Sequence, residues 1–343
     1  MTIYFAGSSV MDFDEVLAGG IDGIDDTSTG VQADLSASEN FAVAKNFAST
    51  ETTSLWLTFR LYDTVVSSPF SEFSLSNPPG ESTVSIWDGE GNPIFYGGFN
   101  ANSSNAFQGR VYLRDGSTQD FLEMFPYGTH FDGAKYDFHV QPGVGLKVYV
   151  NRALVFEYSG NVGNSLSTVN GVGKFGIGNG DQYAFPEFTD ILAANFDTRF
   201  AEVQRVTVNT TPSTDTSSYG DSSLTPTIVS GYNRGTYLDR HNLGFDANGE
   251  KVIYPENDTI SITTGASVVG VVMNFSGFET GAAPAANLTP IVEVGGVEYT
   301  GTPAALSTSP TYIQHVFTTN PATSAAWTES DLEGLGYGFS MNT

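Results

Sequence analysis

Short runs of β-branched and aromatic residues recur along this chain, and almost no stretch shows the 3.6-residue periodicity of a helix. Gly, Pro, Asn, Asp and Ser separate the runs, which include residues 54–62, 83–87, 93–96, 110–114 and 136–140. Closely spaced short strands with turn residues between them are typical of antiparallel sandwiches and barrels. The sequence therefore predicts an all-β protein.

One hairpin can be predicted in detail. Residues 146–150 and 153–158 are two such runs, and only Asn151-Arg152 separates them. A two-residue connection joins antiparallel strands through a tight turn. Because side chains alternate along a strand, we expect Val148 on one face of the sheet and Tyr149 on the other.

The composition changes after Val208. Residues 209–223 consist almost entirely of Thr, Ser, Asp, Pro and Gly, which is typical of a linker or a long loop. The length of 343 residues suits about two domains of ~150 residues each. We therefore expect a β-sandwich over residues 1–208, a linker over 209–231 and a smaller β-sandwich over 232–343.

The C-terminal region contains the only helix that the sequence predicts. Residues 328–331, Thr-Glu-Ser-Asp, have the spacing of a capping box, so we expect a short helix from about Glu329. It should end at Gly334 or Gly336, and a last strand over 337–341 should follow.

Basic residues are scarce. The chain has 13 Lys and Arg against 38 Asp and Glu, a net charge of −25, and no run of basic residues. Proteins that bind nucleic acid or anionic membranes need clustered Lys and Arg to displace counterions. The sequence therefore predicts no nucleic-acid partner, and a strongly acidic surface that suits a saline environment outside the cell.

The chain contains no Cys, which excludes disulfide scaffolds, thiolate zinc sites and Cys nucleophiles. Its first residues lack the positive region of a secretory signal. The most apolar stretch, residues 266–275, is far shorter than the ~20 residues that span a bilayer. We expect a soluble protein that is made in the cytoplasm and does not insert into a membrane.

Two catalytic patterns are missing. A glucanase on a β-jelly roll needs paired carboxylates at short strand spacing, but Glu157, Glu279, Glu293 and Glu298 each stand alone. The Gly-x-Ser-x-Gly pattern of a serine nucleophile is also absent. The sequence therefore predicts no catalytic residues and a protein that is not an enzyme.

Two histidines and two carboxylates lie close together in the sequence, as His130, Asp132, Asp137 and His139. Such a set can bind a transition metal. The spacing fits a histidine in a loop and a single histidine on a strand better than a ligand pattern, so no metal site is predicted.

Calcium is an alternative that the sequence leaves open. The stretches 22–26 and 246–250 are acidic turns that offer several oxygen ligands, but neither has the spacing of an EF-hand. Turns favour Asp and Asn for their bonds to the backbone in any case. The sequence therefore predicts no cofactor, with Ca²⁺ as the weaker alternative.

Sugar-binding sheets use exposed aromatic side chains as platforms. Trp56, Trp87, Tyr96 and Tyr149 are candidates by residue type. Most aromatic residues of a β-sandwich lie between its sheets, so we expect a core role for them. The sequence alone does not name a binding site.

The hairpin at residues 147–157 resembles a hairpin of laminin-G, pentraxin and other concanavalin-like domains, although Arg152 stands where these have Gly. Residues 175–178, Phe-Gly-Ile-Gly, are similar to the strand that those domains place next. The resemblance implies a concanavalin-like jelly roll for residues 1–208.

Three other stretches resemble tailed-phage and prophage virion proteins. They are residues 1–7 with Asp12-Phe13, residues 188–199, and residues 320–338 with their Asn-Pro, Trp-Thr and Leu-x-x-Leu pattern. Asn195 differs from the Asp that is usual at its position in those proteins. The resemblance touches both ends and the middle of the chain.

This resemblance implies a non-enzymatic structural component of a tailed-phage virion, made in the host cytoplasm. We expect a head decoration or cement protein, or a fibre-like protein, on the outer surface of the head or tail. Its partners would be other virion proteins and further copies of itself. The alternatives are a carbohydrate-binding adhesin or receptor-binding tail module that takes a host surface glycan, and thirdly a glycoside hydrolase or polysaccharide lyase.

Overall fold

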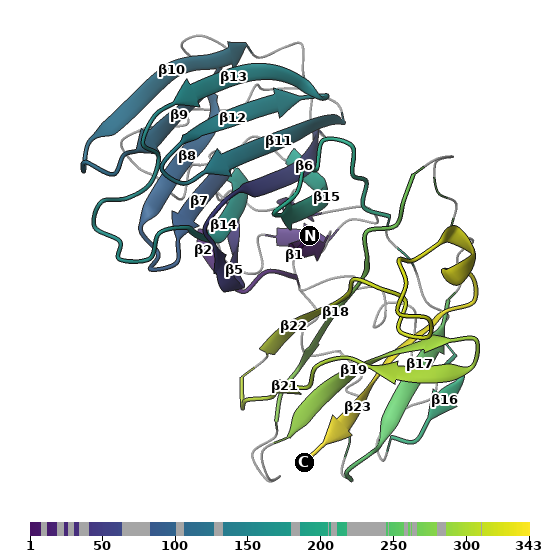
Figure 1. The fold of residues 1–343 in the computed structure, drawn as a ribbon. Coiled ribbons are helices and arrows are strands. Elements are labelled where there is room, and N and C mark those ends of the chain that lie inside the picture. The colour runs from purple at the N-terminus through teal and green to yellow at the C-terminus, as the bar shows by residue number, and fades with distance from the viewer. Residues whose placement is uncertain are drawn as a thin grey trace. The chain divides into compact units, whose positions relative to one another are not determined.

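The computed structural model consists of antiparallel strands and one three-residue 3₁₀ turn in its described part (Figure 1). It describes residues 1–7, 12–18, 24–26, 31–33, 41–63, 83–100, 106–126, 133–179, 186–204, 206, 211–217, 245, 247–256, 260, 262, 266–279, 286–309 and 311–343. The predicted all-β fold class is confirmed. The chain divides into two compact units, Met1–Gln204 and Arg205–Thr343, which we call unit 1 and unit 2.

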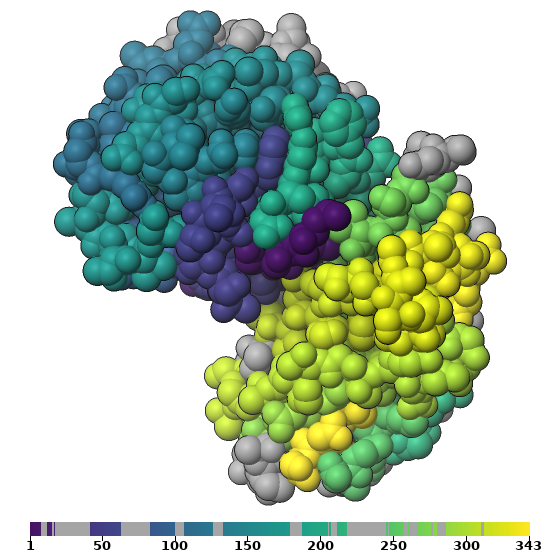
Figure 2. Space-filling view, viewed as in Figure 1, coloured from purple at the N-terminus to yellow at the C-terminus, as the bar shows by residue number. Residues whose placement is uncertain are grey.

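Unit 1 is built from two antiparallel sheets. The strands of sheet A are β1 (Ile3–Gly7), β3 (Ile24–Asp26), β4 (Val31–Ala33), β6 (Leu55–Asp63), β11 (Ala134–Gln141), β12 (Gly145–Val150), β13 (Ala153–Ser159) and β15 (Pro186–Ala194). Their order is β13-β12-β11-β6-β15-β4-β3, and β1 pairs with β15. In the space-filling view the dark purple N-terminal strand lies at the surface against the teal-green β15 (Figure 2).

Sheet B has seven strands. They are β2 (Glu15–Ala18), β5 (Phe41–Glu51), β7 (Val84–Asp88), β8 (Pro93–Asn100), β9 (Ala106–Tyr112), β10 (Thr118–Pro126) and β14 (Val172–Asn179). Their order is β10-β9-β8-β7-β14-β5-β2, so strands far apart in the sequence lie side by side.

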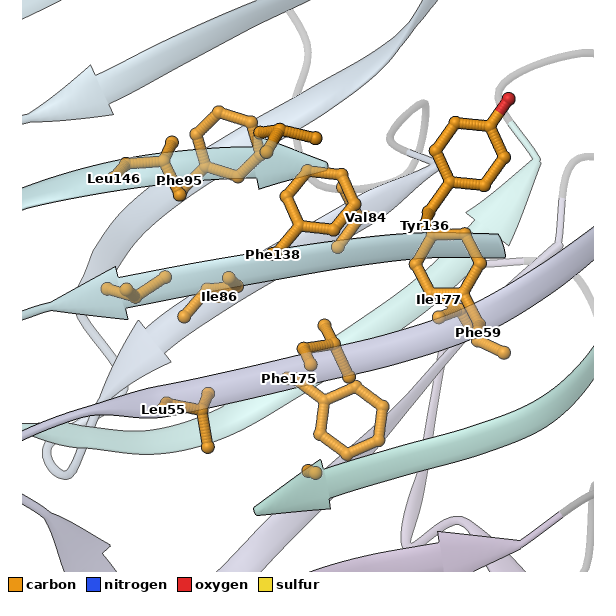
Figure 3. Close-up of a cluster of buried hydrophobic side chains, with 14 of the residues drawn as sticks. Leu55, Phe59, Val84, Ile86, Phe95, Tyr136, Phe138, Leu146, Phe175 and Ile177 are labelled. Carbon is orange, nitrogen blue, oxygen red and sulfur yellow. The ribbon is translucent and has the colours of Figure 1, made fainter. Parts of the chain in front are cut away.

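The core of unit 1 lies between the two sheets. Figure 3 shows Phe59, Tyr136 and Phe138 of sheet A pointing toward the same space as Phe95 and Phe175 of sheet B. The rings of Phe95 and Phe138 are 5.9 Å apart across this space. Period-2 alternation produces the arrangement, because every second residue of each strand turns an apolar side chain inward.

The predicted hairpin is confirmed. Strand β12 pairs with β13 through the two-residue turn at Asn151 and Arg152, whose φ angles are 49° and 74°. Both residues therefore adopt the left-handed conformation that a tight hairpin turn requires. Val148 lies in the core and Tyr149 on the opposite face of sheet A, as alternation predicts.

Unit 2 contains a six-stranded and a two-stranded antiparallel sheet. The larger has β16 (Thr214–Asp215), β17 (Lys251–Pro255), β23 (Gly336–Asn342), β19 (Asn287–Val294) and β20 (Val297–Thr300) in that order, with β21 (Ala304–Ala305) paired to β19. The smaller pairs β18 (Val271–Gly277) with β22 (Thr311–Phe317). Strand β16 belongs to the stretch 209–231, most of which lies outside the described residues.

The predicted C-terminal helix is a single 3₁₀ turn, Glu329–Asp331. Its capping box forms as expected, because the Asp331 carboxylate accepts the backbone N–H of Thr328 at 2.8 Å. The turn ends before Gly334, whose φ of 70° redirects the chain into β23. In the part of the chain that the structure describes, no helix has the length and apolar character to cross a membrane.

Candidate functional site

Four loops at one end of unit 1 surround a pocket of about 260 Å³, which we call the rim pocket. The loops are the turns β7–β8, β9–β10 and β11–β12, and the segment 160–171 that leads into β14. Its polar lining residues are Asp88, Arg114, Asn164, Ser165, Ser167 and Asn170. Its other lining residues are Ile94, Pro142, Gly163, Val169 and Gly171.

Asp88 holds the β7–β8 turn in shape. Its Oδ1 accepts the backbone N–H groups of Glu90 and Asn92, both at 2.9 Å, and its Oδ2 accepts the Asn92 side-chain amide at 3.1 Å. Gly91 supplies the φ of 84° that the turn needs. The buried Asp88 carboxylate is thus fully engaged by its own turn.

Segment 160–171 is attached to the neighbouring turns by its backbone. The N–H of Arg114 donates to the carbonyl of Asn161 at 3.0 Å, and the N–H of Gly143 donates to the carbonyl of Val162. Further along, the Thr168 hydroxyl and N–H donate to the Glu90 carboxylate and hold its pKa below the usual value. Hydrogen bonds therefore hold the walls of the pocket to one another.

Three polar side chains of the rim pocket have unused hydrogen-bonding capacity. Within the described residues, the side chains of Arg114, Ser165 and Asn170 make no hydrogen bond. The Ser167 hydroxyl, in contrast, donates to the carbonyl of Val169 at 2.8 Å. The pocket thus presents a guanidinium, a hydroxyl and an amide that are available to a ligand.

The four aromatic candidates lie elsewhere: they are buried rather than exposed platforms, as expected, but none of them lies between the two sheets. Trp56 and Tyr149 are on the outer face of sheet A, and Trp87 and Tyr96 on the outer face of sheet B. All four side chains are nevertheless buried. The sequence pattern shows that they are apolar and large, but not which face of its sheet each one occupies.

Each outer-face tryptophan is covered by other side chains. The Trp56 ring stacks on His139 at 4.1 Å, with the Arg199 guanidinium 5.4 Å from its centre. The Trp87 indole donates to the Tyr96 hydroxyl at 2.9 Å, and Lys174 lies 5.0 Å above its ring. These contacts leave no open aromatic platform at Trp56 or Trp87.

Asp137 and His139, two of the four metal candidates, lie on the outer face of β11. Asp137 accepts the Thr58 hydroxyl at 2.6 Å, and the His139 Nε2 is 2.8 Å from the Ser54 hydroxyl. Burial lowers the pKa of His139 to about 4, and burial raises the pKa of Asp137. The other two candidates, His130 and Asp132, lie outside the described residues.

The described residues contain no group of three His, Asp or Glu side chains that is arranged to hold a metal ion. Of the proposed calcium turns, residues 22, 23 and 246 lie outside the described residues. Glu250 accepts the N–H of Ala247 at 3.1 Å and so closes its own turn.

The single carboxylates that the sequence singled out have separate local roles. Glu157 forms an ion pair with Lys147 at 3.0 Å, and Glu298 with Lys251 at 2.6 Å. Glu293 is opposite Glu298 across the β19–β20 hairpin, and Glu279 accepts the N–H of Ala286 at 3.4 Å. None of the four lines the rim pocket.

No protein-family model and no curated protein sequence matches the chain. Among solved structures, it is similar to the globular domain of T. cruzi calreticulin, at 10% identity and a TM-score of 0.40, over 58% of this chain and 90% of that one. It is similar to an endo-β-1,4-glucuronan lyase from the fungus Trichoderma reesei, at 12% identity and a TM-score of 0.40. This match covers 59% of this chain and 98% of the lyase. The receptor-binding domain of a botulinum neurotoxin C/D mosaic serotype matches at 11% identity and a TM-score of 0.32. This match covers 74% of this chain and 66% of that domain's chain.

Enzymes are among these matches, and this corrects the expectation that the chain is not an enzyme. Besides the glucuronan lyase, an alginate lyase and a Trypanosoma rangeli sialidase match it at 10% and 12% identity. The two motifs that are missing from the sequence belong to hydrolysis, so their absence does not cover lyase chemistry. At these identities and TM-scores the likeness assigns no activity to this chain.

Proposed function

We propose that this chain is a binding module on the outer surface of a tailed-phage particle, on its head or tail, and that unit 1 holds a host-surface saccharide in the rim pocket. The observation that carries the saccharide part is the pocket itself, whose Arg114, Ser165 and Asn170 side chains are free to bind a ligand. Support for the virion part comes from the resemblance at residues 1–7 with Asp12-Phe13, at residues 188–199 and at residues 320–338.

The pocket's size and lining suit a sugar. Its volume of about 260 Å³ is just below the ~300–1,000 Å³ of pockets for drug-sized ligands, so it suits about one sugar ring. Hydroxyl-rich ligands need hydrogen-bond donors and acceptors, which the Asn170 and Ser165 side chains supply. The half-buried Val169 adds apolar surface for the carbon face of a ring.

The hydrogen bonds between the pocket walls favour ligand binding, because they reduce the conformational entropy that the loops lose when a ligand binds. Loops that must become ordered on binding lose part of the interaction free energy. Here the backbone bonds at Asn161 and Val162, and the contact between Glu90 and Thr168, hold the loops before any ligand arrives.

A glycan array with the full chain tests the saccharide part. We expect a signal for the native chain that Asn170→Ala abolishes, because the amide would contact the sugar. Gln119→Ala is the matched control, since this exposed amide on β10 lies outside the pocket and donates to the neighbouring carbonyl of Asp120. An array without signal, or a signal that Asn170→Ala leaves unchanged, would overturn the proposal.

Mass spectrometry of purified particles tests the virion part. We expect the chain among the particle's proteins, and its copy number separates the head lattice, with hundreds of copies, from a tail position, with few. Absence of the chain from the particle would contradict display on a virion while leaving the saccharide site to be judged by the array.

A further inference from the structure

Arg114 differs from most of the basic residues around it. Nine Lys and Arg residues lie in residues 1–204, and all nine are described. Seven of them have a carboxylate oxygen within 4.0 Å: Lys45, Arg60, Arg110, Lys135, Lys147, Lys174 and Arg199. Only Arg114 and Arg152 have none among the described residues. In a chain with 38 acidic residues, a cation without an acidic partner needs a reason.

Arg152 has other partners that account for it. Its Nε donates to the carbonyl of Arg199 at 3.3 Å, and its guanidinium lies 4.9 Å from the centre of the Phe200 ring. The Arg114 side chain has no such contact within the described part of the chain. Of the two, only Arg114 lines the rim pocket.

Two glycines leave room along the Arg114 side chain. A Cβ atom added to Gly143 would lie 3.7 Å from the Arg114 Nη1, and one added to Gly163 would lie 3.3 Å from its Nε. Both glycines have positive φ, 77° and 140°, so other residues would be strained there. Backbone without a side chain therefore lies beside the half-buried Arg114 side chain at Gly143 and at Gly163.

The backbone beneath this side chain is held in place. The Arg114 N–H bonds the carbonyl of Asn161, and Leu113 forms a β-bridge with Val162. The pocket's own carboxylate is engaged elsewhere, because Asp88 accepts hydrogen bonds from Glu90 and Asn92 of its own turn. The pocket thus contains one cation on a fixed backbone, and its side-chain donors make no hydrogen bond within the described residues.

We propose that Arg114 binds the carboxylate of an acidic sugar, such as a uronic acid, in the rim pocket. This inference rests on the proposed function and names its ligand class. A guanidinium matches a planar carboxylate with two parallel hydrogen bonds, and these charge-assisted bonds are stronger than neutral ones. A single arginine neutralises a single carboxylate, whereas a doubly charged phosphate would keep excess negative charge beside a chain of net charge −25.

The test is a calorimetric titration of the full chain with an oligoglucuronate and with the same oligosaccharide reduced to its neutral form. We expect the native chain to prefer the acidic sugar, and Arg114→Gln to weaken that binding by about tenfold or more and to remove the preference. Arg114→Lys should recover part of it, since it restores charge without the planar fork. Arg152→Gln is the control and should bind like the native chain.

The outcomes separate this inference from the proposed function. Equal binding of both sugars that Arg114→Gln leaves unchanged overturns the inference and leaves the saccharide site standing. Binding of neither sugar, together with a silent glycan array, overturns both. Binding of a sulfated sugar alone, lost in Arg114→Gln, overturns the carboxylate assignment. We expect the thermal unfolding midpoint of Arg114→Gln to match that of the native chain. Such a match shows that the variant loses binding while it stays folded.

Discussion

Thr198 attaches the segment after β15 to the outer face of sheet A. It is fully buried, and its hydroxyl contacts Thr58 and lies 3.3 Å from the Asp137 Oδ1. The Lys135 ammonium donates to the carbonyls of Thr198, at 2.7 Å, and of Arg199. Within the described residues Asp137 Oδ2 is buried without a hydrogen bond, so this network is already short of donors.

We therefore predict that Thr198→Val destabilises the protein by about 1–3 kcal/mol, because Asp137 loses a donor that buried surroundings cannot replace. The measurement is the free energy of unfolding in denaturant. Thr118→Val, at an exposed position of β10, is the matched control and should change it by less than about 0.5 kcal/mol. Equal losses in the two variants would contradict the role of this network.

His139 provides a pH-dependent contribution to stability. Its burial, assisted by the charge of Lys147, lowers its pKa to about 4, against about 6.5 in an unfolded chain. Between these two pKa values His139 is protonated in the unfolded chain but neutral in the folded chain. The free energy of unfolding therefore falls as the pH drops through this window. Charged Asp197 and Arg199 also face the ring but shift its pKa less.

We predict that the native chain loses about 1–2 kcal/mol more stability than His139→Gln between pH 7 and pH 5. Carboxylates titrate in both proteins, so the difference between the two pH profiles isolates the histidine. Parallel profiles would show that the ring takes up its proton in the folded state as readily as in the unfolded one.

At the scale of elements, local pattern decided some strands and long-range pairing decided others. The β12–β13 hairpin could be predicted to the residue, because alternation and a two-residue turn are both local. Strand β5, Phe41–Glu51, has an Ala- and Asn-containing sequence of weak β character. It is extended because it lies between β14 and β2, and β14 is more than a hundred residues away.

The rim pocket depends on the turns as elements. We predict that Asp88→Ala costs about 1–3 kcal/mol of stability and weakens saccharide binding, because the β7–β8 turn loses the acceptor for two backbone N–H groups. Asp115→Ala is the control: this exposed carboxylate caps the N–H of Ser117 in the β9–β10 turn but does not line the pocket. It should lose less stability and keep binding, and a reversed order would be inconsistent with a pocket shaped by Asp88.

At the scale of the whole molecule, each unit has its own apolar core. The core of unit 1 lies between its sheets, and that of unit 2 gathers Trp327, Leu332 and Leu335 with Val292 and Phe317. We predict that residues 1–204, produced alone, unfold in one cooperative transition with a midpoint near that of unit 1 in the full chain. Calorimetry checks this, and a fragment without a transition would contradict an independent unit.

Charge also acts at this scale. Because 38 acidic residues face 13 basic ones, self-repulsion opposes the compact state. We predict that NaCl at 0.5 M, by screening this repulsion, stabilises the chain by about 1 kcal/mol, equivalent to about 2–4 °C in Tm. The gain should shrink at pH 4, where part of the carboxylates is protonated. A Tm that falls with salt would mean that the ion pairs outweigh the repulsion.

The sequence by itself determined the all-β class, the β12–β13 hairpin and the capping box of the C-terminal turn. These features depend on residues within a few positions of one another. Only the tertiary structure decided the rim pocket, since Asp88, Arg114 and Asn170 belong to loops whose meeting depends on the order of strands in two sheets. It also decided that Trp56 and Trp87 are buried on outer faces, because a strand's pattern separates its two faces without showing what covers each.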